Sequence, residues 1–248
     1  MKPLHIPQNS PIYSLYIEFI SLTSYVHSIR KINDTSRYEP YEPSMFIYSF
    51  FTFNTLYNID WTNTKAENYT TIIFKNDGSE LSKINSYIYF ITHALDWRAM
   101  NNLSEIFRDS ILDIISKYLL IQGNNYEEDA IIDWIKECMS YFILSPDSDT
   151  NNKQARHFTH EDIDNFKNYL YAALSRFGPT NKLTVHGLKQ IIHPIYFIRC
   201  NLFHGAKTPN LFEHRKQKER FVIYAAILAG INQMLFYIIS KSLGQSHK

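Results

Sequence analysis

Residues 221–239 read FVIYAAILAGINQMLFYII, and none of these side chains is charged. An apolar stretch of this length either spans a bilayer or forms a buried helix of a helical domain. Asn232 and Gln233 lie near its middle, beside Gly230, and polar side chains at that depth are costly in a membrane. The stretch therefore predicts a buried core or interface helix, within a longer helix expected at 215–241.

Helical periodicity extends outward from this stretch over most of the chain. Pro11 opens an expected helix at 11–31, and Ser44 is expected to cap a helix at 44–58. One face of the latter helix is aromatic: Phe46, Phe50, Phe53 and Tyr57. Further helices are expected at 80–98, 103–121, 127–143, 160–176 and 185–203, with Ser79, Ser104 and a Thr159–Asp162 capping box at three of the starts.

Two segments interrupt the helical pattern. Residues 70–74, followed by the turn signal Asn76-Asp77-Gly78, predict at most a minor edge strand. The polar stretch 145–157 predicts an internal loop, and it is too short and central to demand a second domain. We therefore expect a single all-α domain over residues 1–248, built as a bundle of seven or eight helices.

Composition restricts the function classes. Lys plus Arg is 25 and Asp plus Glu is 24, so no charge field over the whole chain recruits nucleic acid or membrane. The sequence has no P-loop, no Gly-x-Ser-x-Gly and no His-Glu-x-x-His motif. Cys138 and Cys200 match no zinc spacing, and His157 and His160 are interpreted as a solvated helix start. We expect no metal or cofactor and, without a visible secretory signal, a cytoplasmic protein.

One segment stands apart chemically: residues 198–207 read IRCNLFHGAK. Arg199, Asn201 and His204 interrupt an apolar helix, and Gly205 supplies a left-handed position that ends it. An arginine can bind phosphate through two N–H groups, and a histidine transfers protons near neutral pH. Those two roles are needed to cut RNA by attack of a ribose 2′-hydroxyl on the adjacent phosphate. A structural arginine with a capping histidine is the alternative that the residues alone leave open.

The Arg-x4-His pattern at the end of an apolar helix, followed by glycine, resembles the signature of the HEPN superfamily, in particular its Apea-like bacterial group. The aromatic run at 46–57 is similar to the first core helix of that group. The resemblance implies an all-α, metal-independent endoribonuclease that serves as a bacterial toxin or phage-defence effector. Its partners would be RNA, a second copy of the chain and an antitoxin or defence-system protein.

The same resemblance places Arg199 on the scissile phosphate and His204 in proton transfer, in a composite site at a homodimer interface. Cys200 stands where ribonucleases of the family commonly have a polar residue. A non-catalytic HEPN-like module that binds nucleotide or protein is therefore kept as the alternative.

Helix geometry also favours a dimer. Arg199 and His204 are five residues apart, which places them about 140° apart around an α-helix unless the helix end unwinds at Gly205. A second chain related by a twofold axis brings each motif against its copy, and residues 221–239 are expected to supply the dimer surface. Asn201 shares a face with His204 and is expected to orient His204 or the ribose.

Two further predictions concern surrounding residues. Asn54 lies among aromatic neighbours and is expected to be buried, with its amide bonded either to a neighbouring helix or to the Arg199–His204 region. Residues 205–220 are expected to form an RNA entrance, in which the following side chains can be positively charged: Lys207, His214, Arg215, Lys216, Lys218 and Arg220.

Overall fold

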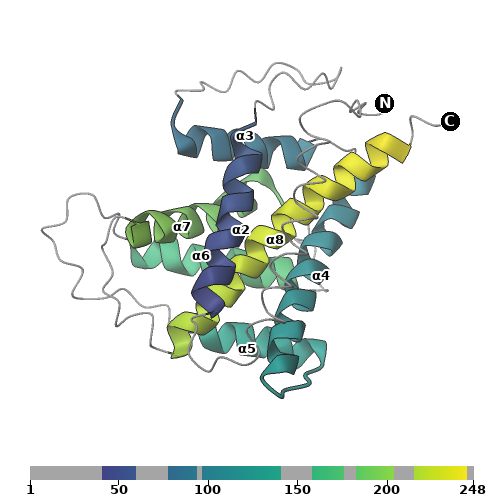
Figure 1. Ribbon diagram of the computed structural model, residues 1–248. Coiled ribbons are helices and arrows are strands. Elements are labelled where there is room, and N and C mark those ends of the chain that lie inside the picture. Colours follow the sequence, from purple (N-terminus) through teal and green to yellow (C-terminus); the bar gives the residue numbers. More distant parts are fainter. Residues whose placement is uncertain are drawn as a thin grey trace, which may run out of the picture.

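The computed structural model describes residues 41–59, 78–93, 97–140, 158–175, 183–203 and 215–244. These residues form seven helices and no strand, which confirms the all-α fold (Figure 1). The expected helix at 11–31, the edge strand at 70–74 and the loop at 145–157 lie outside the described residues. The helices are α2 (Tyr41–Tyr57), α3 (Glu80–His93), α4 (Trp97–Ile121), α5 (Glu128–Ser140), α6 (His160–Leu174), α7 (Val185–Phe203) and α8 (Arg215–Gly244).

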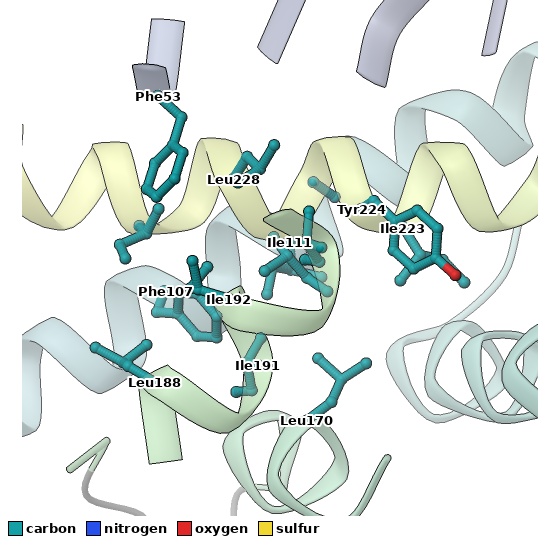
Figure 2. Packing of buried hydrophobic residues seen from close by; sticks show 14 of the residues in the cluster. Phe53, Phe107, Ile111, Leu170, Leu188, Ile191, Ile192, Ile223, Tyr224 and Leu228 are labelled. Atoms are coloured by element: carbon teal, nitrogen blue, oxygen red, sulfur yellow. The ribbon is translucent and has the colours of Figure 1, made fainter. Parts of the chain in front are cut away.

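Helix α8 is the central element of the described fold. Residues 221–228 are all buried, and α8 packs against both α2 and α4 (Figure 1). Figure 2 shows Phe53 of α2 approaching α8 from one side, while Phe107 of α4 and Ile192 of α7 lie on the other. Because apolar area removed from water is the main favourable contribution to folding, this shared burial holds the helices together.

The same helix is long and apolar enough, over Arg215–Ser240, to cross a membrane by length and composition alone. However, 83% of its most apolar window is buried inside the protein, as in the core helix of a globular domain. This burial corrects the expectation that residues 221–239 form a dimer surface. Their side chains are already covered by helices of the same chain, so little of the apolar face is left for a second copy.

Gly230 allows α4 and α8 to approach closely. A Cβ atom added at Gly230 would lie 3.1 Å from the Phe107 carbonyl oxygen, 3.1 Å from Phe107 Cδ2 and 3.3 Å from Ile111 Cγ1. The first of these atoms belongs to the backbone, so it cannot move without shifting α4.

We therefore expect Gly230→Ala to destabilise the protein by about 1–3 kcal/mol, because the extra methyl group overpacks the α4–α8 contact. Thermal or denaturant unfolding followed by circular dichroism measures the change. In an uncrowded helix the same substitution stabilises by up to about 1 kcal/mol through helix propensity. A raised melting temperature would therefore contradict the close approach.

The aromatic face of α2 is buried as predicted. Phe46, Phe50 and Phe53 are each no more than 1% exposed. The Phe46 ring stacks on Phe221 of α8 at 5.5 Å between centroids, and Phe53 meets Tyr87 of α3 edge-on at 5.7 Å. These contacts fix α2 against two other helices at once.

Two predicted helix starts are wrong. Helix α2 begins at Tyr41, so Ser44 lies inside it rather than capping it, and Pro43 occupies the first turn. Proline is tolerated there because the first N–H groups of a helix have no partner within the helix. Helix α4 begins at Trp97, and Ser104 is buried inside it, where its hydroxyl accepts a hydrogen bond from the Leu183 amide at 3.2 Å.

The other two predicted caps are confirmed. The Ser79 hydroxyl accepts a hydrogen bond from the Ser82 amide at 3.2 Å, in the first turn of α3. Thr159 and Asp162 form a reciprocal capping box at the start of α6. Helix α7 has the predicted bounds, although Pro194 lies inside it.

Candidate functional site

Arg199 lies one turn before the end of α7, which stops at Phe203. The apolar side chains of this helix, among them Ile195 and Ile198, are buried in the core. Arg199 follows these buried side chains on α7, and 23% of its own side-chain surface is exposed to water. The arginine is therefore half-buried, with its charge at the boundary between the core and water.

Glu80 is the acidic partner of Arg199. It is the first residue of α3, and its Oε2 lies 3.7 Å from Arg199 Nη1, an ion-pair distance too long for a hydrogen bond. Two tyrosines hold the carboxylate more closely: Tyr196 donates to Oε2 at 2.8 Å and Tyr57 to Oε1 at 3.1 Å. The N-terminal end of α3 also favours a negative charge. Side chains from α2, α3 and α7 thus meet around one carboxylate.

Both tyrosines stay protonated near neutral pH. Burial raises the pKa of Tyr57, and the negative charge of Glu80 raises it further. Burial likewise raises the pKa of Tyr196, to which its hydrogen bond with Glu80 adds. Since a phenol donates only while protonated, these shifts extend to more alkaline pH the range over which both hydroxyls can donate to Glu80.

Phe50 and Cys200 also lie beside the arginine. The guanidinium carbon lies 5.1 Å from the centroid of the Phe50 ring, a cation–π distance. Cys200 Sγ lies 3.9 Å from Arg199 Nη1. Cys200 is therefore in contact with the arginine itself.

Asn54 is half-buried rather than fully buried as predicted. Its side-chain oxygen accepts a hydrogen bond from the Tyr57 hydroxyl, whose single proton is shared between this oxygen and Glu80. The amide therefore reaches Arg199 only indirectly, through Tyr57 and Glu80. We name the set Asn54, Tyr57, Glu80, Tyr196 and Arg199 the arginine cluster.

We expect Asn54→Leu to destabilise the protein by about 1 kcal/mol, because the Tyr57 hydroxyl loses one of its partners in a half-buried place. Thr55→Ala is the matched control on the same helix, since Thr55 is exposed and its hydroxyl donates to its own helix, at 3.0 Å to the Phe51 carbonyl. Urea unfolding compares the two variants. Equal stabilities would show that the Asn54 amide is not needed.

The cations at the start of α8 are partly neutralised by acidic neighbours. Arg215 Nε lies 2.9 Å from Glu219 Oε1, and Lys216 Nζ lies 2.7 Å from Glu137 Oε1 and 3.3 Å from Glu219 Oε2. Glu219 is buried and also accepts from Cys138 Sγ at 3.4 Å. Burial next to this carboxylate raises the pKa of Cys138.

These contacts weaken the predicted RNA entrance. The Arg215 side chain is 86% exposed, but that of Lys216 is only 21% exposed. Lys218 and Arg220 are half-buried, and the Arg220 guanidinium contacts Gln217. Arg215 is therefore the best placed of these four cations to meet a polyanion.

Several predicted site residues cannot be placed. His204 and Lys207 lie outside the described residues, as do Gly205 and His214, and Asn201 lies on α7 without a described side chain. Sequence reasoning in turn missed Glu80 and Tyr196. Tyr196 could have been found, because it precedes Arg199 by three residues and so shares its helix face. Glu80 is far from Arg199 along the chain, so no spacing in the sequence indicates that the two residues meet.

Over the ranges that the structure describes, no three His, Cys, Asp or Glu side chains are grouped to hold a metal ion. Comparison of the chain with protein-family models, with curated proteins and with solved structures gives no match. The HEPN resemblance therefore depends on the two sequence segments alone, the Arg-x4-His segment and the aromatic run at 46–57.

Proposed function

We propose that the protein is a metal-independent endoribonuclease of the HEPN type, with Arg199 and His204 as its catalytic residues. The observation that carries the proposal is the arginine cluster: three helices hold a half-buried Arg199 one turn before the helix end that leads to His204. A carboxylate and an aromatic face lie beside this arginine, and two tyrosines donate to that carboxylate.

The proposed reaction is cleavage by the RNA's own 2′-hydroxyl. The 2′-oxygen forms a bond to phosphorus as its proton passes to a base, and the bond from phosphorus to the 5′-oxygen breaks as that oxygen takes up a proton. Arg199 stabilises the negative charge that develops on the phosphate oxygens. His204 carries a proton in one of the two transfers, and Asn201 orients His204 or the ribose.

The 140° separation expected for Arg199 and His204 if the helix continued to His204 is the reason for proposing a site shared between two chains. Because α8 is covered within one chain, the two copies would meet around the end of α7 instead. As a toxin or phage-defence effector in the cytoplasm, such an enzyme would be restrained by an antitoxin or a defence-system partner.

Cleavage of a mixed RNA pool in EDTA tests the activity. We expect wild-type protein to cut and Arg199→Ala to lose at least about 100-fold in rate, because the charge on the transferring phosphate is no longer stabilised. Lys117→Ala is the control for a lost cation, since Lys117 is exposed on α4 and pairs with Asp113. Arg199→Ala that cuts at the wild-type rate would contradict the proposal.

Mixing two inactive chains tests the composite site. If each site takes its arginine from one chain and its histidine from the other, Arg199→Ala mixed with His204→Ala recovers about a quarter of the wild-type activity. Half of the dimers are then mixed, and each has one intact site. If both residues come from one chain, the mixture stays inactive. Cleavage by a protein that is monomeric in analytical ultracentrifugation would also exclude a composite site.

The ion pair of Arg199 with Glu80 favours a second candidate, a non-catalytic module that binds nucleotide or protein. A carboxylate already compensates the arginine, as in a purely structural pair. In that case RNA would remain uncut, and Arg199→Ala would lower the stability of the protein rather than a rate.

A further inference from the structure

Glu80 is held in place independently of Arg199. Its two oxygens each accept a tyrosine hydroxyl, at 2.8 Å from Tyr196 and 3.1 Å from Tyr57, and both distances are shorter than the 3.7 Å to Arg199 Nη1. The tyrosines come from different helices, α7 and α2, so the carboxylate cannot turn without breaking one contact or the other. Glu80 thus presents a negative charge at a fixed place beside the guanidinium.

An aromatic ring, that of Phe50, also restrains the Arg199 side chain. The Phe50 ring lies 5.1 Å from the guanidinium carbon, and Phe50 itself is fully packed in the core. A fixed ring and a fixed carboxylate together define both the position and the direction of a side chain that otherwise has many rotamers.

We infer that Glu80 is a positioning residue: it sets the direction of the Arg199 guanidinium for a phosphate group, and Tyr57 and Tyr196 act through it. The inference rests on the proposed function, because it assigns a task to the same arginine. The alternative role for Glu80 is that of a plain counter-ion, which competes with the phosphate for Arg199. The two roles have opposite consequences once the charge of Glu80 is removed.

Glu80→Gln separates these roles. If Glu80 is a positioning residue, kcat for RNA cleavage falls by at least about tenfold, because the arginine no longer points at the phosphate. KM is unchanged or lowered, because the variant has lost a negative charge that repels RNA. For a competing counter-ion, RNA binds more tightly and kcat does not fall. Glu105→Gln is the matched control, since it removes an exposed carboxylate from α4 and corrects for the general effect of charge on RNA affinity.

A second readout does not require activity. In 15N-labelled protein, the side-chain N–H signal of Arg199 is identified by its loss in Arg199→Lys. We expect this signal to shift in Glu80→Gln and, less strongly, in Tyr196→Phe, which keeps the ring and removes one hydroxyl from Glu80. Glu105→Gln should leave the signal in place. Tyr196→Phe also serves if Glu80→Gln fails to fold.

The outcomes distinguish this inference from the proposed function. An Arg199 signal that is the same in Glu80→Gln, or in Tyr196→Phe if only that variant folds, overturns the inference whether or not the protein cuts RNA. Unchanged kcat with tighter RNA binding overturns it as well. A wild-type protein that does not cut RNA, but whose Arg199 signal shifts in the variants, disproves the proposed function and leaves Glu80 as the residue that directs Arg199.

Discussion

The burial of α8 is the constraint on which the rest of the described structure depends. A helix with so long an uncharged stretch is stable in water only if other helices cover it on several sides, and α2 and α4 do most of this. The α4 contact is close enough that a methyl group at Gly230 would require α4 to shift by a few tenths of an ångström. The α2 contact is aromatic, through Phe46 against Phe221. Because α2 and α4 are both fixed against α8, the sides of these two helices that face away from α8 are held in place as well.

The arginine cluster depends on this arrangement through α2. Phe50 belongs to the aromatic face that packs into the core, yet its ring also lies beside the guanidinium of Arg199. Tyr57, at the end of the same helix, is buried and reaches Glu80 with its hydroxyl. The half-buried arginine is thus placed by apolar packing and directed by a polar network. A network of this kind is costly if one member is left unsatisfied, which restrains each of its side chains.

The sequence predicted the helices well where apolar residues recur at helical spacing. It predicted helix starts poorly where a residue, such as proline or serine, suits two different structural positions. Helix α7 has its predicted bounds because its apolar residues, such as Ile191 and Ile195, recur at helical spacing. The start of α2 was misplaced because proline suits both a loop and a first helical turn. Ser104 was misread because a serine can cap a helix or, as here, satisfy a distant amide.

The candidate site could be predicted only in its local part. The motif singled out Arg199 and predicted a role for it, but the partners of Arg199 depend on tertiary structure. Tyr196 and Glu80, for example, are 116 residues apart in the chain and meet at 2.8 Å. The ion pair of Lys216 within the predicted cationic entrance was missed for the same reason, since Glu137 on α5 reaches Lys216 from a distant part of the sequence.

The central claim is that Arg199 stabilises a phosphate attacked by the neighbouring 2′-hydroxyl. Mass spectrometry of the ends of RNA fragments produced in EDTA tests it most directly. The account predicts 2′,3′-cyclic phosphate on one fragment and a 5′-hydroxyl on the other, and no such products from Arg199→Ala. Fragments with a 3′-hydroxyl and a 5′-phosphate, or the same cyclic products from Arg199→Ala, would contradict it.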